Sequence, residues 1–148
     1  MSAIIATVRD GVITDFNAAG TAYFGTTHPF TAIKKWFDVK DHTEEALSVI
    51  VLGDQQRTSR LTRDRQQIEV DVIVRVTKKL TGDTEAEVDG LCELVELMER
   101  YYYANASIST IKGTLQNSIM QLPSRSQLKG SARFYAWARL TFFCVNQN

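Results

Sequence analysis

The feature that most constrains this chain is the regular spacing of apolar residues between Gln66 and Leu80, with mostly polar residues in the gaps. In the stretch QQIEVDVIVRVTKKL, apolar side chains occupy every second position from Ile68 to Val76. Successive side chains of a β-strand point to opposite faces, so this pattern predicts a strand with one face in a core and one polar face. A strand of this kind requires partner strands and an apolar layer packed against it.

The stretch SARFYAWARLTFFCV near the end of the chain alternates in the same way. One set of positions should pack on a helix: Phe134, Ala136, Ala138, Leu140, Phe142 and Cys144. The opposite set is Arg133, Tyr135, Trp137, Arg139, Thr141 and Phe143. In a lone subunit this second face would leave large aromatic surface in water. We therefore expect Tyr135, Trp137 and Arg139 to contact another subunit.

An acidic amphipathic helix is predicted to begin at Thr84, which forms a capping box with Glu87. Its apolar stripe consists of Val88, Leu91, Leu94, Val95, Met98 and Tyr102. The remaining surface carries Asp83, Glu85, Glu87, Asp89, Glu93, Glu96 and Glu99. These carboxylates spread around the solvent side with no opposing set of ligands, which favours a solvated face over a metal site.

The first residues allow two interpretations. Apolar residues from Ile4 to Phe16 follow a helical spacing behind Ser2, an N-cap candidate, and this favours a helix over residues 3–18. The Asp10-Gly11 pair would also suit the turn of a hairpin. The glycine-containing stretch AAGTAYFGTTHP then suggests a mobile connection.

Three further segments favour strands. FTAIKKWFDV suits a short strand or an extended edge, and LSVIVLG at residues 47–53 suits a buried strand. Residues 107–122 suggest a strand interrupted by Gly113 and closed by Pro123. The element order predicts a single α+β domain over residues 1–148, with a mainly antiparallel sheet and helices on one face.

The loop DQQRTSRLTRDR is expected to form the tip of a long hairpin. It holds Arg57, Arg60, Arg63 and Arg65. These arginines suit either nucleic-acid phosphates or an acidic surface. The chain carries such a surface at Glu85, Asp89, Glu93 and Glu96. Contact between the two surfaces on neighbouring copies would be head-to-tail, and such contacts close into rings when the rotation allows.

Several classes of function have little support. Seventeen basic residues balance seventeen acidic ones, which argues against a broad field for non-specific nucleic-acid binding. A membrane span and a secretory signal are not expected. Cys92 and Cys144 should be buried free thiols. Neither His28 nor His42, which follows Asp41, has metal-ligand spacing, so no metal, cofactor or enzymatic activity is expected.

The chain resembles the minor tail or tail terminator proteins of long-tailed bacteriophages. The resemblance spans about residues 30–145. It is carried by FTAIKKWFDV, LSVIVLG, the Ser59-Arg60 pair, QQIEVDVIVRVTKKL, AEVDGLCELVELMERYY and QLKGSARFYAWARLTFFCV. Its strongest part is the passage from the alternating strand into the acidic helix.

The resemblance implies a virion protein, assembled in the host cytoplasm, that forms a ring at the head-tail junction. Rings of this family commonly have six subunits, end the growth of the tail tube, dock to the head connector and let double-stranded DNA pass through the centre. The arginine loop would then point to a neighbour, an adjacent ring or the lumen. Alternatives are a head-completion or stopper ring, a nucleic-acid-binding module that uses the arginine loop, and a hydrolase centred on Asp41 and His42.

Overall fold

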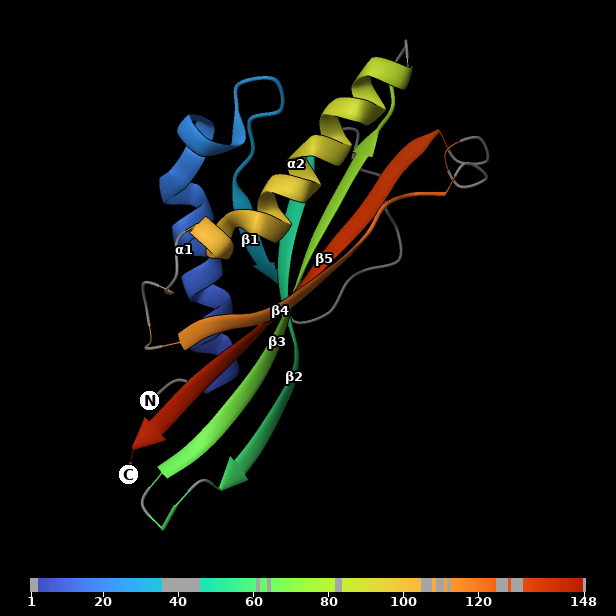
Figure 1. The fold of residues 1–148 in the computed structure, drawn as a ribbon. Coiled ribbons are helices and arrows are strands. Elements are labelled where there is room, and N and C mark those ends of the chain that lie inside the picture. The colour runs from blue at the N-terminus through green and yellow to red at the C-terminus, as the bar shows by residue number, and fades with distance from the viewer. Residues whose placement is uncertain are drawn as a thin grey trace.

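The computed structural model describes residues 3–35, 46–60, 62–63, 65–81, 84–104, 108, 111, 113–124, 128 and 132–147. Within these residues the chain forms two helices and five strands (Figure 1). The helices are α1 (Ile4–Phe24) and α2 (Thr84–Ala104). The strands are β1 (Ala32–Lys35), β2 (Ser48–Arg60), β3 (Arg65–Lys79), β4 (Gly113–Gln121) and β5 (Arg133–Gln147).

The strands form one mixed sheet in the order β1-β2-β3-β5-β4. β1 pairs with β2 in parallel, and the other three pairings are antiparallel. The predicted α+β class with a mainly antiparallel sheet is therefore confirmed. The two strands with the clearest alternation, β3 and β5, lie side by side in the centre of the sheet, where one face of each is buried.

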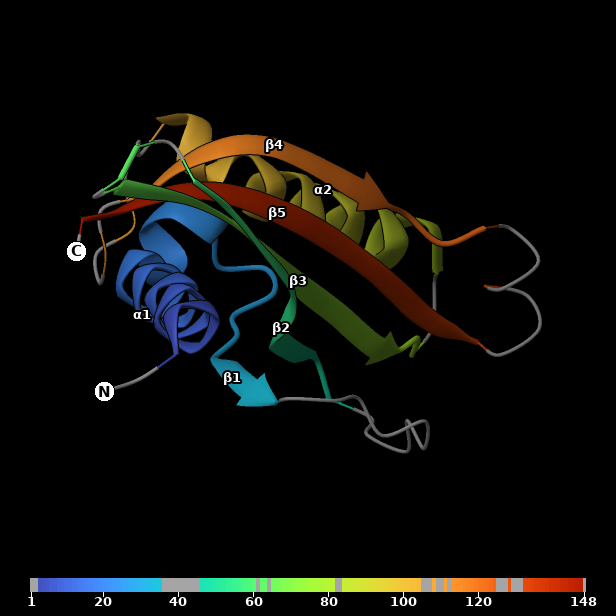
Figure 2. The ribbon, with the colours of Figure 1, turned by 90° about the horizontal axis from the view of Figure 1, so that it is seen from below.

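The core lies between one face of the sheet and the two helices (Figure 2). On β3 the side chains of Val70, Val72, Val74 and Val76 are completely buried, as the alternation predicted. The predicted inward face of β5, from Phe134 to Cys144, is likewise buried. Helix α1 contributes Val8, Val12 and Phe16, and α2 contributes Leu91, Leu94, Val95, Met98 and Tyr102. The apolar stripe predicted for α2 is thus its core side.

Helix α1 resolves the two interpretations of the first residues in favour of the helix. The segment Ile4–Phe24 is helical beyond the predicted end at residue 18, although Gly20 interrupts it with non-helical angles (φ 52°, ψ −148°). Only glycine adopts such angles readily, so the chain bends there and then resumes its helical course. The prediction of a mobile connection from residue 18 onward was therefore wrong for the part up to Phe24. Ser2 lies outside the described residues.

The segment predicted as an arginine-rich loop is largely strand. β2 and β3 remain paired from Ser48 opposite Thr77 to Arg60 opposite Gln66, with one irregularity between Gly53 and Gln55. Polar residues in this part of β2 are exposed, so they gave no apolar alternation by which a strand could be recognised. The extension places Arg60 and Arg65 at the far end of the two strands.

The outer edge of β1 is partly closed by a side chain of α1. Asn17 Nδ2 donates to the carbonyl oxygen of Ala32 (3.2 Å), and the Ala32 N–H donates to Asn17 Oδ1 (2.8 Å). The amide of Asn17 therefore satisfies both backbone groups of this edge residue, as a neighbouring strand would.

Candidate assembly surfaces

Arg57 was predicted to face a neighbouring molecule, but its guanidinium is held within the chain. Nη1 and Nη2 donate to the two carboxylate oxygens of Asp71 (3.1 and 3.2 Å), and Nη2 lies 2.9 Å from Glu69 Oε1. These hydrogen bonds, to Glu69 first and then Asp71, raise the pKa of Arg57. Asp71 also accepts from Thr141 Oγ1 (2.8 Å). This network was not predicted from the sequence, because the pairing register of β2 on β3 determines which residues face each other across the strands.

The other three arginines form an exposed group, which we call the arginine tip: Arg60, Arg63 and Arg65. The tip lies where β2 ends and β3 begins. Arg60 Nε donates to the carbonyl oxygen of Thr62 (3.3 Å), which orients its guanidinium. The three side chains therefore bring positive charge to one end of the molecule.

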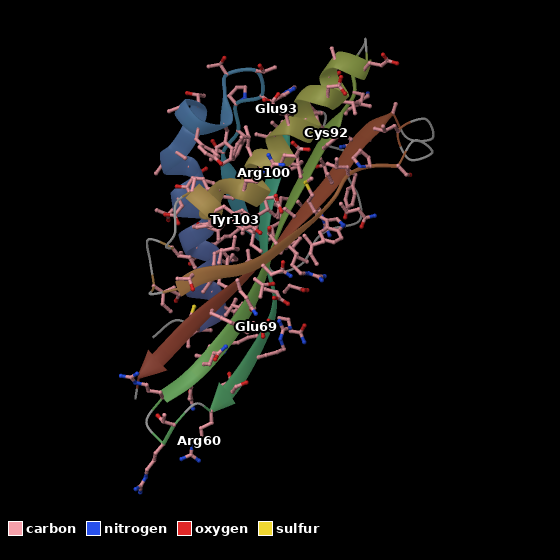
Figure 3. The ribbon with its side chains drawn as sticks, viewed as in Figure 1. Arg60, Glu69, Cys92, Glu93, Arg100 and Tyr103 are labelled. Atoms are coloured by element: carbon pink, nitrogen blue, oxygen red, sulfur yellow. The ribbon has the colours of Figure 1, made fainter. Side chains whose placement is uncertain are left out.

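The acidic face of α2 lies toward the opposite end of the molecule. Glu85, Asp89 and Glu93 are exposed, and Glu96 is half-buried. Figure 3 labels Arg60 and Glu93 on well-separated parts of the fold. Strands β2 and β3 hold the two surfaces apart, because they run the length of the molecule. Three of the four predicted arginines and three of the four predicted carboxylates are therefore exposed, and they lie too far apart to meet within one subunit.

The aromatic face of β5 lies on the side of the sheet away from the helices. Tyr135 and Trp137 are half-buried, and each carries a guanidinium over its ring. Arg75 Cζ is 5.3 Å from the centroid of Tyr135, and Arg139 Cζ is 5.5 Å from that of Trp137. These cation–π contacts cover part of the aromatic surface. The rings are thus less exposed in one subunit than the alternation suggested.

Two further observations characterise this sheet face. Ile119 on β4, which pairs with Arg139, is 50% exposed. Arg133 Nη1 and Arg139 Nε are buried without a hydrogen-bond partner among the described residues, although Arg139 Nε lies 3.7 Å from Asp54 Oδ2. Buried donors normally have acceptors, so these arginines favour additional acidic or carbonyl groups on this face.

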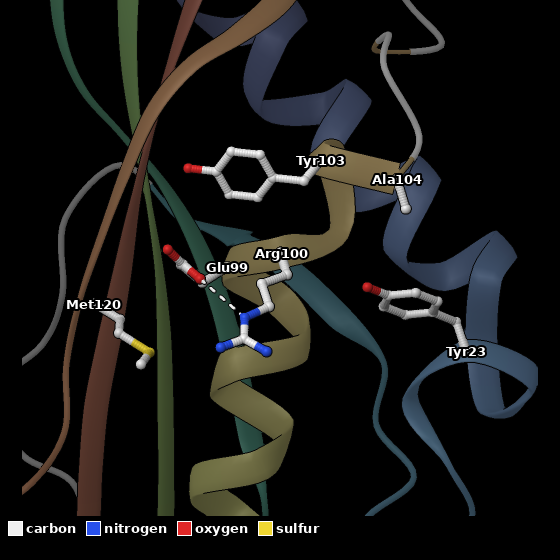
Figure 4. A pocket seen from close by; sticks show the side chains of 6 residues that line it. All are labelled: Tyr23, Glu99, Arg100, Tyr103, Ala104 and Met120. Carbon is white, nitrogen blue, oxygen red and sulfur yellow. Dashed lines mark ion pairs between the residues drawn. The ribbon is translucent and has the colours of Figure 1, made fainter.

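A shallow, open hollow of about 570 Å³ lies at the end of α2, between β4 and Tyr23 of α1 (Figure 4). It is lined by Tyr23, Glu99, Arg100, Tyr103, Ala104 and Met120. Ser118 Oγ donates to Glu99 Oε1 (2.7 Å) and lies 2.9 Å from the hydroxyl of Tyr103. Since the single hydroxyl proton of Ser118 goes to Glu99, the Tyr103 hydroxyl donates to Ser118. Sequence reasoning did not find this site, because its residues come from separate elements and form no motif.

A second polar cluster joins the start of α2 to the end of β3. Glu87 pairs with Lys78 Nζ and accepts the Thr81 N–H (3.1 Å), and the bond from Lys78 is the main cause of its lowered pKa. The predicted start of α2 at Thr84 is confirmed. His28 lies against Gly90, where an added Cβ would be 2.9 Å from His28 Nε2. Burial, followed by repulsion from Lys78, lowers the pKa of His28.

The remaining candidates for chemistry form no recognisable centre. Within the described ranges, no group of three or more His, Cys, Asp or Glu residues could hold a metal ion. Cys144 is buried and Cys92 half-buried, both are free, and burial raises the pKa of both thiols. Asp41 and His42 lie outside the described residues. No helix among those described is long and apolar enough to cross a membrane.

Comparison with known proteins adds no assignment: no protein-family model matches the chain, and no curated protein matches it.

Proposed function

We propose that this protein is a structural component of a bacteriophage virion that forms a closed ring, most consistent with a tail terminator at the head-tail junction. The observation that carries the proposal is the separation of charge along one subunit. An exposed arginine tip lies at one end, and the exposed carboxylates of α2 lie toward the other. Opposite charges on two different surfaces favour head-to-tail contact between identical subunits.

The architecture suits this role. β2 and β3 form a stiff extension that carries the tip, because they are paired to Arg60. The network of Arg57 with Asp71 and Glu69 pins the base of that extension. A subunit therefore presents a preformed projection to its neighbour, which lowers the entropy lost when the ring closes.

The sheet face opposite the helices supplies a second contact in the proposed ring. Tyr135, Trp137 and Arg139 belong to the residue types that most often dominate binding energy at protein interfaces. A neighbouring subunit, or a tail-tube or head-connector protein, would cover the half-buried rings and provide acceptors to Arg133 and Arg139. Double-stranded DNA passes through the proposed ring without a dedicated binding site, and no bond-making chemistry is required.

Charge reversal at the tip tests the proposal. The purified protein is expected to form rings, with six subunits as the family resemblance implies, in electron micrographs and in sedimentation velocity. The double variant Arg60→Glu, Arg63→Glu should remain folded and become monomeric, because like charges would face each other across the contact. Reversal of the helix surface in Glu93→Lys, Glu96→Lys should have the same effect.

The matched control is Lys34→Glu, which reverses an exposed charge on β1 away from both surfaces. It should leave assembly unchanged. A wild-type protein that stays monomeric over a wide concentration range at low salt would overturn the ring. If particles lacking the protein have tails of normal length but heads that leak DNA, the alternative stopper ring replaces the terminator.

A further inference from the structure

The residues that line the hollow are suited to bind a guanidinium group, and we call this binding site the seat. Tyr103 is 62% exposed, so its ring is available to a cation. The Glu99 carboxylate lies beside it, fixed by the hydrogen bond from Ser118. Ala104 is the last residue of α2, and the negative end of the helix dipole therefore adjoins the hollow. These three features all favour a planar cation that donates hydrogen bonds.

The seat is preorganised. The chain of hydrogen bonds from Tyr103 through Ser118 to Glu99 joins α2 to β4 and holds the ring and the carboxylate in fixed positions. Because these orientations are set before binding, little entropy is lost when a cation enters. Arg100 is the one cation among the lining residues, and its side chain is 66% exposed with Nε 4.0 Å from Glu99 Oε2. An ion pair that long and exposed is weak, so an incoming guanidinium can displace it.

We infer that this hollow receives Arg60 from the arginine tip of a second copy of the chain. The inference rests on the proposed ring and specifies where its head-to-tail contact is made. Arg60 is exposed and carried on a projection long enough to reach beyond its own subunit. Arg57 does not serve, because Asp71 and Glu69 already hold it.

The position of the hollow at the end of α2 divides the acidic residues of this helix into a near group and a distant group. At the rise of an α-helix, Glu93 and Glu96 lie within about 9 Å of Glu99 along the axis. They are near enough to pair with Arg63 or Arg65 when Arg60 is seated. By the same measure, Asp89 and Glu85 lie about 15 and about 21 Å away. We therefore expect Glu96 and Glu99 to carry the contact, and Glu85 and Asp89 to contribute little.

A double-mutant cycle on the full-length protein tests the seat. Arg60→Ala and Tyr103→Ala should each weaken assembly roughly tenfold or more, measured by sedimentation velocity. The combined variant should be no weaker than the worse single variant, because both changes remove the same contact. Tyr103→Phe, which keeps the ring but loses the hydrogen bond to Ser118, should weaken assembly less than Tyr103→Ala does. Arg100→Ala should assemble more tightly, because the competing cation is gone.

Mixing gives a second and independent result. Arg60→Ala keeps its seat, and Tyr103→Ala keeps its tip, so an equimolar mixture has one intact contact per pair. It should form dimers that do not close into rings. The matched control is Glu85→Gln with Asp89→Asn, which should assemble as the wild type does. Thermal unfolding of each variant excludes a loss of fold.

The outcomes separate the seat from the ring. If wild-type rings form and Arg60→Ala weakens them while Tyr103→Ala and Glu99→Gln do not, the tip contacts another surface and the seat is wrong. If the cycle shows additive effects, the two residues act separately, and the seat is equally wrong. If the wild type never assembles, both the proposed ring and the proposed Arg60 binding site are contradicted. Single-stranded or duplex DNA binding lost in Arg60→Ala but kept in Tyr103→Ala would assign the tip to nucleic acid instead.

Discussion

A buried hydrogen bond joins α1 to α2. The hydroxyl of Tyr102 donates to Asp15 Oδ2 at 2.6 Å, and both residues are buried. Burial, and then this hydrogen bond, raise the pKa of Tyr102. The contact ties α1 to α2 over the sheet, so it stabilises the layer that carries both the hollow and the acidic face.

Removal of this hydroxyl should measurably destabilise the fold. Tyr102→Phe removes this donor from the buried Asp15 carboxylate, and the loss of one hydrogen bond to a buried charged group costs about 1–3 kcal/mol. The free energy of unfolding, from urea titration, should fall by this amount. Tyr103→Phe is the matched control, because Tyr103 is exposed, and it should change the value little. Equal effects of the two changes would contradict the structural role of the Asp15 contact.

His28 should make stability depend on pH in the mildly acidic range. Its pKa in the folded chain lies below the unfolded value of 6.5, because burial and Lys78 disfavour the charged ring more than Glu87 favours it. The unfolded chain therefore binds a proton first as the pH falls. The stability that the neutral His28 ring allows is fully present above about pH 6.5. This part of the free energy of unfolding is lost as the pH falls through the folded pKa.

Unfolding midpoints measured between neutral and mildly acidic pH test this dependence. The wild type should lose stability across that range, and His28→Gln should lose less, since the titrating ring is gone while His42 is retained. An identical pH profile for the two proteins would rule out His28 as the cause.

The contacts of individual side chains were harder to predict from the sequence than the elements or the fold class. The arginines of residues 57–65 were recognisable as a group, but their roles differ. Arg57 is bound to Asp71 and Glu69, whereas Arg60 is exposed at the tip. Spacing along the chain does not reveal this difference, because it arises from the register of β2 on β3. The hollow at Glu99 and Tyr103 was also missed, because its lining residues come from separate elements and form no motif.

At the scale of elements, the contact of His28 with α2 explains a glycine in the middle of a helix. Alanine is normally more stable than glycine in a helix by about 1 kcal/mol. At Gly90 an added Cβ would be 2.9 Å from His28 Nε2, so the imidazole must shift to make room. The gain from Gly90→Ala should therefore be small in the wild type. It should approach about 1 kcal/mol in a His28→Ala background.

A double-mutant cycle in urea tests this coupling. The difference between the two backgrounds measures the clash directly. A full gain from Gly90→Ala in the wild type would show that His28 moves away without cost.

The elements were predictable wherever one face is buried in the core. The alternation in β3 and β5 and the helical stripe of α2 predicted three elements correctly, because burial imposes those periods. The exposed half of β2 was missed because no side chain from Asp54 to Arg60 is buried, so its sequence has no apolar alternation. The parallel pairing of β1 with β2 was also missed, since four residues of strand contain no information about direction.

At the scale of the whole molecule, the predicted fold class is confirmed, whereas assembly remains a prediction. The α+β class follows from element order and from the number of buried faces, which the sequence contains. The separation of charge between tip and helix depends on how far the central strands extend. Composition conceals it, because the net charge of the chain is zero.

Assembly driven by this separation should depend strongly on salt. Exposed charges are screened beyond about 10 Å at 0.1 M ionic strength, so a rise from about 0.05 M to about 0.5 M should weaken association several-fold. The unfolding midpoint of the Arg60→Glu, Arg63→Glu variant should change far less over the same range. Association that strengthens with salt would indicate that apolar contact at the sheet face dominates.

The side-chain amide of Asn17 has a consequence for the way copies of this chain meet. By occupying the first outward-facing peptide unit of β1, it denies an incoming strand the place where lateral zippering would begin. Edge-to-edge pairing of β1 strands from separate molecules into a continuous sheet is therefore disfavoured. In the proposed ring, subunits would then join through side chains, which permit a finite number of copies, while unlimited fibrillar growth is suppressed.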